Sequence, residues 1–382
     1  MDTSATRGME YSAERALYLA FELGNKKWKL GFSTGLGQAP RIREMPAGDL
    51  GALQEEIHLA KKRFGLPEET KTLSCYEAGR DGFWLARYLA QAGIENLVVD
   101  SSSIEVNRRR RRVKTDRMDA TKLVTMLIRY HGGDRKVWHV VRVPSVEAED
   151  GRQPHRELGS LKRERTRHIN RIKGLLAGQG IQIGIGKEFA RDLDKVRLWD
   201  GSALGPGLRA RLVREFERIE LLRQQVRELE WEQREALRHS TRPEMAKVRN
   251  LVRLKGIGIT SAWLYTMELF SWREIRNRRE LGALAGLTPT PHQSGDDSRE
   301  LGISKAGNNH VRAIAIELAW AWLRHQPDSK LALWYQERFA HGGSRVRRIG
   351  IVAVARRLLI DLWRYSETGV IPEGAVLRTR VV

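Results

Sequence analysis

The chain has 382 residues, 41% hydrophobic and 30% charged, which is enough for two or three domains with buried cores. Lys and Arg number 68 against 47 Asp and Glu, and a polyanion is expected to neutralise the formal net charge of +21. A basic surface without a partner is the alternative. The single cysteine, Cys75, excludes an intramolecular disulfide, and no apolar run or signal-peptide pattern is present, so we expect a cytoplasmic protein.

Strand and helix patterns alternate in the first third of the chain. Period-two apolar spacing and turn residues predict strands at 16–23, 27–33, 40–44, 73–76 and 96–99. Helices are predicted at 49–64, 82–92 and 115–130. Three strands followed by helix–strand–helix–strand–helix is the order of a ribonuclease-H-like fold, although composition alone does not separate it from other α/β folds.

Beyond Pro144 the pattern predicts helices only, beginning with charged helices at 157–176 and 208–237. In the second of these, Leu212, Ile219 and Val226 recur every seven residues, with Leu222 and Leu229 beside them. This heptad seam predicts coiled-coil pairing within or between chains, and an ordinary amphipathic helix is the alternative.

The last part of the chain is helical and richer in tryptophan. Helices at 309–325 and 344–365 carry long apolar faces and are expected to form the core of an all-α domain, with their tryptophans packed rather than stacked on bases. The predicted division is 13–145 for the α/β domain, 146–245 for the helical coiled-coil region and 246–382 for the helical C-terminal domain.

Four carboxylates are predicted to meet at one edge of the sheet. Glu22 stands at the end of the first strand, Glu77 stands at the end of the fourth, and Asp116 and Asp119 open the helix after the fifth, three residues apart on one face. Such a cluster suits magnesium, and two ions there would support phosphodiester chemistry. Asp116 and Asp119 are equally consistent with a charge pair that suits the helix dipole.

A basic run stands directly before these aspartates and is followed by Lys114. It is expected to carry a phosphate backbone over the acidic site, and a solvated charged surface is the alternative. The run consists of Arg108, Arg109, Arg110, Arg111 and Arg112.

A second basic site is predicted in the C-terminal half. Lys255, Gly256 and Gly258 resemble the turn of a helix–hairpin–helix element, whose backbone N–H groups grip phosphate, although an ordinary helix–helix turn fits as well. A polar loop with Ser294 then leads to a helix that Asn308 or Asn309 caps. The cations expected to contact phosphate there are Arg299, Lys305 and Arg312.

Several segments, in this order, resemble the DEDD-type transposases of the bacterial insertion-sequence family numbered one hundred and ten. The similarity covers most of the chain. It rests on Tyr76-Glu77-Ala78-Gly79, Lys114-Thr115-Asp116-Arg117-Met118-Asp119-Ala120, Lys255-Gly256-Ile257-Gly258, Ala285-Gly286-Leu287-Thr288-Pro289, Gln293-Ser294-Gly295 and Ile303-Ser304-Lys305-Ala306-Gly307-Asn308.

The resemblance implies a RuvC-like N-terminal domain, a coiled-coil linker and a helical transposase domain in a nucleoid-associated bacterial recombinase. It implies that Glu77, Asp116 and Asp119 bind Mg²⁺, that Ser294 is the DNA nucleophile, and that a dimer or tetramer works with a structured bridge RNA on target and donor DNA. Glu22 departs from the family's usual aspartate. This departure leaves open a catalytically weakened protein that only binds RNA or DNA. A RuvC-like nuclease that uses water as its nucleophile is a second alternative.

Overall fold

In the computed structural model of the protein, the described residues are 15–104, 116–294 and 297–379. Within them, the side chains at 102, 116–118, 291–294 and 297–301 are not described. The chain divides into two compact units, Met1–Pro144 and Ser145–Val382. The finer division of the second unit at 245/246 stays a prediction.

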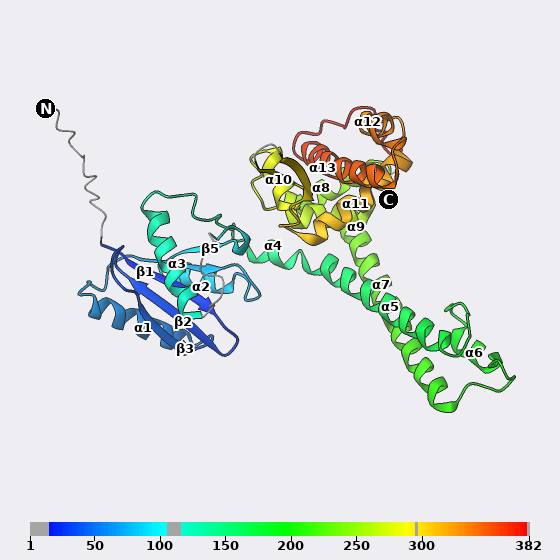
Figure 1. The fold of residues 1–382 in the computed structure, drawn as a ribbon, viewed down its shortest axis with the longest axis horizontal. Helices are drawn as coiled ribbons and strands as arrows, with labels where there is room; N and C mark the ends of the chain where they lie inside the picture. The colour runs from blue at the N-terminus through cyan, green and yellow to red at the C-terminus, as the bar shows by residue number, and fades with distance from the viewer. Residues whose placement is uncertain (1–14, 105–115, 295–296, 380–382) are drawn as a thin grey trace. The chain divides into compact units, whose positions relative to one another are not determined.

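The first unit is built on a five-stranded mixed sheet (Figure 1). The strand order is β3-β2-β1-β4-β5, with β2 antiparallel to its neighbours β1 and β3, and with β4 and β5 parallel to β1. The elements are β1 (Leu17–Leu23), β2 (Lys27–Ser33), β3 (Arg41–Pro46), α1 (Leu50–Arg63), β4 (Thr72–Glu77), α2 (Trp84–Gln91), β5 (Glu95–Val99), the short η1 (Ser101–Ser103) and α3 (Asp116–His131). The predicted order of strands and helices is confirmed, and each end lies within two residues of the expected one.

Local sequence signals explain where α1 begins and ends. The Asp49 side chain caps the helix by accepting a hydrogen bond from the Ala52 N–H at 2.9 Å. Basic residues fill the last turn, where their positive charges interact favourably with the negative end of the helix dipole. Gly65 then takes a left-handed φ of 62°, which stops the helix.

The two faces of the sheet bury different side chains, because successive residues of a strand point to opposite faces. Phe21 and Tyr76 belong to the core beneath α1 and α2. Ala20 and Cys75 belong to the core beneath α3. Cys75 is a buried thiol, as predicted, and burial raises its pKa far above the usual range.

The second unit begins with a helical stalk. After the short α4 (Val146–Asp150), α5 (Gln153–Ala177) and α7 (Pro206–His239) lie side by side as a long hairpin (Figure 1). The connection between them carries α6 (Phe189–Asp192) and η3 (Leu193–Lys195).

The heptad seam of α7 packs against α5 of the same chain. Leu212 and Ile219 share a core cluster with Ile172 of α5. Leu222 and Val226 share another with Leu158 of α5. Of the two options left open by the sequence, pairing within the chain is therefore the one observed, and pairing between chains through this seam is not needed to bury it.

The remaining helices of the second unit surround one large core. The core includes Trp322, which is buried as predicted, whereas Trp320 on the same helix is half exposed. The helices are α8 (Pro243–Arg253), α9 (Ile259–Tyr265), the π-helix η4 (Thr266–Phe270), α10 (Arg278–Leu284), α11 (Asn309–His325), α12 (Lys330–Tyr335), the π-helix η5 (Gln336–Ala340) and α13 (Ser344–Thr368).

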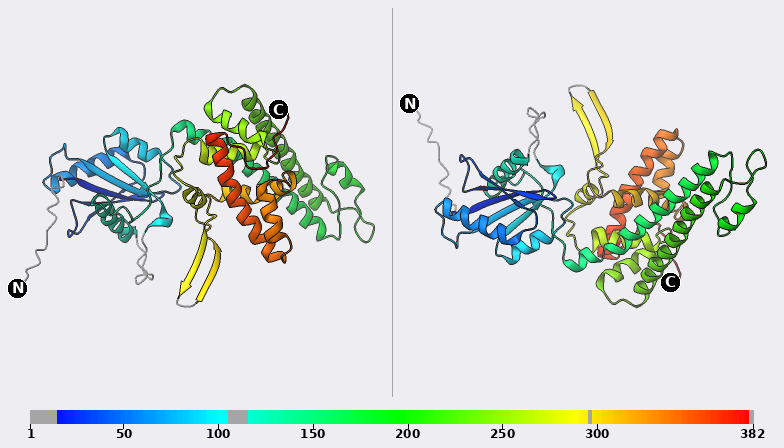
Figure 2. Two further views of the ribbon diagram at one scale, coloured as in Figure 1. Left: turned by 90° about the horizontal axis from the view of Figure 1, so that it is seen from above. Right: turned by 90° about the horizontal axis from the view of Figure 1, so that it is seen from below.

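The prediction that strands stop at Pro144, and with it that of an all-α C-terminal domain, is wrong. An antiparallel ribbon of β6 (Pro289–Ser294) and β7 (Asp297–Ile303) projects from these helices (Figure 2). The segment lacks the apolar alternation that predicts a strand, and it holds Pro289 and Pro291. The pairing register shifts between these two prolines, as expected where residues without an N–H interrupt a ladder.

Within the part of the chain that the structure describes, no helix combines the length and the apolar character needed to cross a membrane.

The stalk seam gives a first prediction. Replacing Ile219 by Glu places an unpaired charge between α7 and α5, so the free energy of unfolding should fall by about 2–4 kcal/mol in chemical denaturation. Because α5 already fills the seam, the mass by light scattering should stay that of the parent protein. Leu221→Glu is the matched control on the same helix, since Leu221 is 55% exposed. A loss of oligomer mass specific to Ile219→Glu would contradict the intrachain seam.

Candidate functional site

Glu22 and Glu77 stand at the carboxyl ends of adjacent parallel strands. The last registered pair of β1 and β4 is Phe21 with Tyr76, so the two glutamates follow side by side. Alternation along the strands places both on the face of Ala20 and Cys75, which is the face covered by α3. The predicted convergence of these two carboxylates at one sheet edge agrees with the register.

Helix α3, which carries Asp116 and Asp119 in its first turn, covers the same face. It packs over β1, β2 and β4, and it approaches β2 closely at Gly31, where an added Cβ would lie 3.1 Å from the Ala120 carbonyl oxygen. Asp119 precedes Ala120 directly and is half-buried. Asp116 begins the helix, as predicted, but its side chain lies outside the described residues.

The donor chemistry of this edge fits a hard divalent cation, because carboxylates from adjacent strands converge on one face. Lys29 stands directly opposite Glu22 on β2 and adds a cation to the same neighbourhood. Among the described residues, no three His, Cys, Asp or Glu side chains group closely enough to hold a metal ion.

Asp100 is an acidic residue of this edge that the sequence analysis missed. It follows β5, the third parallel strand, and its backbone N–H donates to the His139 carbonyl at 2.9 Å. The signal was present, because an acid directly after a predicted strand is the same pattern that selected Glu22 and Glu77. The predicted arginine run 108–112 and Lys114 lie outside the described residues.

Ser294 is the last residue of β6, so it is carried on a ribbon and not on the predicted loop; its side chain lies outside the description. The base of this ribbon is closed by three backbone hydrogen bonds between 284–288 and 304–308. They are Ser304 N–H to Thr288 O at 2.8 Å, Lys305 N–H to Gly286 O at 3.1 Å and Asn308 N–H to Leu284 O at 2.8 Å. Two of the segments that carried the resemblance are thus the two sides of one ribbon base.

Glycine is required where these two segments touch. Gly307 has φ 136°, and an added Cβ would lie 2.5 Å from the Leu284 carbonyl oxygen. Gly286 has φ 65°, and its Cβ would lie 2.8 Å from the Ala306 carbonyl oxygen. Both contacts are shorter than any side chain tolerates, so the backbones interlock only without side chains there.

Two of the predicted phosphate contacts lie at this base. Arg312 is half-buried, and its Nη1 donates to the Lys305 carbonyl at 2.9 Å, which gives this guanidinium a role in holding the base. The Lys305 side chain is exposed, and its backbone φ of 56° is the left-handed one that non-glycine residues rarely adopt. Arg299 lies on β7, but its side chain is not described.

A turn at 254–258 joins α8 to α9, which is compatible with both the predicted helix–hairpin–helix element and an ordinary helix–helix turn. Gly256 has φ 87°, and Gly258 caps α9. The Lys255 N–H, however, donates to the Val376 carbonyl at 3.2 Å, so the C-terminal segment occupies a donor that phosphate would need. The Lys255 side chain is exposed.

Comparisons with known proteins agree with this picture. The model of the transposase IS116/IS110/IS902 family matches residues 248–333, which hold the turn, the ribbon and its base. A protein of Sinorhizobium fredii named "Putative transposase y4rJ" is 40% identical over 377 residues, 95% of each chain. The chain belongs to the IS116/IS110/IS902 transposase family.

Two further transposases show similarity over much of the chain. The transposase for insertion sequence element IS1328 of Yersinia enterocolitica is 24% identical over 340 residues, 85% of this chain and 96% of that protein. The transposase for insertion sequence element IS1111A of Coxiella burnetii is 28% identical over 224 residues, 58% of each. The chain is accordingly an insertion-sequence transposase, an enzyme with DNA as its partner.

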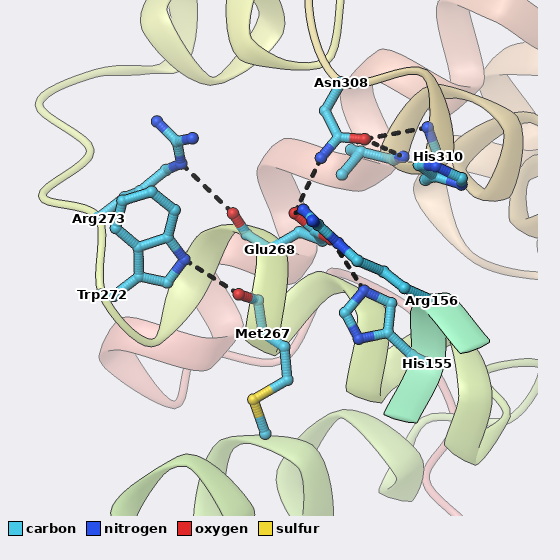
Figure 3. Close-up of polar contacts among 9 residues, drawn as sticks. His155, Arg156, Met267, Glu268, Trp272, Arg273, Asn308 and His310 are labelled. Atoms are coloured by element: carbon cyan, nitrogen blue, oxygen red, sulfur yellow. Dashed lines mark hydrogen bonds and ion pairs between the residues drawn. The ribbon is translucent and has the colours of Figure 1, made fainter. Parts of the chain in front are cut away.

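A buried carboxylate ties the ribbon base of this transposase to its stalk. Glu268, in the π-helix η4, is 2% exposed and lies among side chains from α5 and from the start of α11 (Figure 3). His155 Nε2 lies 2.9 Å from its Oε1, Arg156 donates through Nε at 2.7 Å and Nη2 at 3.0 Å, and Asn308 Nδ2 donates at 3.0 Å. Burial opposes ionisation of Glu268, but the hydrogen bonds from His155 and Arg156 outweigh it and hold its pKa at about 2.

Asn308 makes the connection to the serine ribbon. Its side-chain oxygen caps α11 by accepting from the N–H groups of His310 and Val311, at 2.9 and 3.2 Å, while its own N–H closes the ribbon base. The sequence analysis predicted this cap but missed Glu268. The available signal was an acid inside the apolar run Tyr265 to Phe270, an unfavourable place for a solvated carboxylate.

Glu268 gives a second prediction. A carboxyl whose folded pKa is lowered from 4.5 to about 2 stabilises the fold above pH 4.5, and this stabilisation disappears as the pH falls toward 2. Glu268→Gln should therefore lower the free energy of unfolding of the second unit by about 3 kcal/mol near pH 7, and by less near pH 3. Denaturant titration at both pH values measures this. Glu188→Gln, at an exposed ion pair with Arg191, should change the free energy of unfolding little at either pH. A loss of stability in Glu268→Gln that is the same at both pH values would refute the ionic role.

Proposed function

We propose that this transposase cuts and rejoins DNA strands as an RNA-guided recombinase, with Ser294 as nucleophile and an acidic site that holds Mg²⁺. The observation that carries the proposal is the interlocked base of β6 and β7. Two glycines, one left-handed lysine and a capped helix fix the strand on which Ser294 lies. A ribbon held this firmly at its base suits a group that must meet a phosphorus atom reproducibly.

The N-terminal unit is proposed to be a RuvC-like domain of the DEDD type. Its strand order, with three antiparallel strands followed by two parallel ones, supports this, as does the register of Glu22 and Glu77. Asp116 and Asp119 would complete the ligand set from α3. A divalent cation bound there would stabilise negative charge on phosphate oxygens and favour ionisation of an attacking hydroxyl.

Ser294 would attack the phosphorus through its Oγ. The serine–phosphorus bond forms as the bond from phosphorus to a strand oxygen breaks, and the proton of the serine hydroxyl leaves to a base or to the departing oxygen. Attack by the hydroxyl of another strand then reverses the step, so the strands are rejoined without an external energy source. A serine hydroxyl needs activation, which the acidic site would supply in this chain or in another subunit of a dimer or tetramer.

The bridge-RNA part of the proposal rests on the family resemblance and on charge. The net charge of +21 exceeds what an isolated protein of this size needs for solubility, and it favours a large polyanion. The alternative function is a RuvC-like nuclease that uses water, in which Ser294 has no covalent role.

A third prediction separates these functions. Ser294→Ala should still bind DNA but form no covalent protein–DNA adduct on a denaturing gel, and Asp119→Asn should abolish both cleavage and adduct at the same Mg²⁺ concentration. Ser304→Ala, at the exposed ribbon base, and Glu55→Gln, on the exposed surface of α1, are the matched controls and should keep activity. A mixture of Ser294→Ala with Asp119→Asn should recover activity only if the site is shared between subunits. Cleavage by Ser294→Ala at the parent rate would favour the water nucleophile.

A fourth prediction concerns the RNA. The protein purified with its own element should retain one discrete structured RNA from the non-coding end of that element, identified by sequencing after nuclease protection. Because phosphate contacts dominate such binding, the RNA should dissociate steeply as salt rises from about 50 to 200 mM. Recovery of only random cellular RNA would remove the guide from the proposal and leave the DNA chemistry untouched.

A further inference from the structure

Trp320 is exposed on α11 in a way that packing does not explain. The core side of this helix carries Trp322, which is 1% exposed and donates from Nε1 to Ser329 Oγ at 2.9 Å. Trp320 is 52% exposed, and within the described ranges its indole has neither a hydrogen bond nor a ring contact. Large aromatic rings exposed in this way commonly mark binding surfaces.

Two hollows meet at this indole, and both are basic. One, of about 420 Å³, is lined by Trp320, Tyr335, Ala340, Ser344, Arg347 and Arg348. The other, of about 530 Å³, is lined by Trp320, Ala321, Leu323, Arg324 and His325. No acidic residue is among these described lining residues, and both volumes are in the range of about 300–1,000 Å³ typical of ligand sites.

The arginines of this surface lack anionic partners. Arg324, Arg347 and Arg348 are exposed, and none has a salt bridge or side-chain hydrogen bond in the described part of the chain. Arg347 and Arg348 also stand in the first turns of the 25-residue helix α13, whose first turn has no acidic residue. Cations at the positive end of a helix dipole are unfavourable unless an anion binds there, so this placement indicates an anionic partner.

Packed aromatic rings lie behind Tyr335, a residue that lines the first hollow. The rings of Tyr335 and Phe339 stack with centroids 6.0 Å apart. Phe339 reaches the backbone of α13 at Gly350, where an added Cβ would lie 2.5 Å from its Cγ. An exposed indole beside unpaired guanidinium groups is the combination that binds unpaired nucleotides, with a base on the indole and phosphates on the arginines.

We infer that Trp320, Arg324, Arg347 and Arg348 form a binding surface for single-stranded DNA, distinct from the acidic site and from the serine ribbon. One base stacks on the indole, and the phosphates on its two sides lie over Arg324 in one hollow and over Arg347 and Arg348 in the other. Single-stranded DNA is the occupant because this transposase acts on DNA, and because an indole stacks on an unpaired base without the cost of unstacking a duplex.

Fluorescence anisotropy of the full chain with labelled oligothymidylate tests the surface, without metal or strand cleavage. Trp320→Ala should weaken binding roughly 5- to 150-fold, the effect of losing one stacked base, while Trp320→Phe should keep most of the affinity. Arg347→Gln with Arg348→Gln should weaken binding and flatten its salt dependence by about two phosphate contacts. Duplex DNA of the same length should bind Trp320→Ala as it binds the parent.

Matched controls separate the surface from general charge. Trp199→Ala removes a still more exposed tryptophan, at 92%, and Arg211→Gln with Arg214→Gln removes two exposed arginines from α7. Both should bind oligothymidylate like the parent. Photocrosslinking of iododeoxyuridine-substituted single strands should place the adduct on the peptide that contains Trp320.

Several outcomes would overturn the inference. They are parent-like affinity of Trp320→Ala, an equal loss for duplex and single strand, a loss confined to oligouridylate, or a crosslink elsewhere with none at Trp320. Because Ser294→Ala and Asp119→Asn leave this surface intact, failure here is distinct from failure of the proposed chemistry.

Discussion

The second unit depends on one ionised carboxylate without access to water. Glu268 accepts hydrogen bonds from α5 and from Asn308, so the stalk, the π-helix η4 and the start of α11 share a single buried anion. A buried charge is costly unless every lone pair is used. Here the guanidinium of Arg156 neutralises it, and the side chains that satisfy it come from segments 113 and 40 residues away in sequence. These segments are thereby fixed relative to one another.

The geometry of the ribbon base depends on the same contact. Asn308 orients its amide toward Glu268, which leaves its oxygen to cap α11 and its backbone N–H to meet Leu284. Gly286 and Gly307 then allow two backbones to approach within van der Waals distance. The position of the strand that carries Ser294 therefore depends on a series of hydrogen bonds that begins in the stalk.

Much of the first unit could be predicted from sequence, because alternation, capping residues and turn glycines are local signals. The sheet edge with Glu22 and Glu77 could be predicted by the same reasoning. The ribbon β6–β7 could not, since its prolines and polar residues break the alternation. The heptad of α7 identified a buried stripe but not its partner, because a stripe of Leu, Ile and Val carries no information about which helix covers it. Glu268 was missed because its partners are remote in sequence.

The two π-helices have a consequence for how sequences of this family align. A π turn holds one residue more than an α turn, and η4 shows it in the hydrogen bond from Ser271 N–H to the Thr266 carbonyl, five residues back. Removing one residue from η4 would restore α geometry and rotate the preceding helix α9 by about 100° relative to the chain after the turn. Glu268 would then lose the hydrogen-bond partners that surround its carboxylate. The same applies to η5, whose Ala340 lines a hollow beside Trp320. Single-residue gaps at these two turns are therefore changes of register between whole helices, whereas a gap of equal length in the irregular segment 181–186, between α5 and α6, changes no helix register.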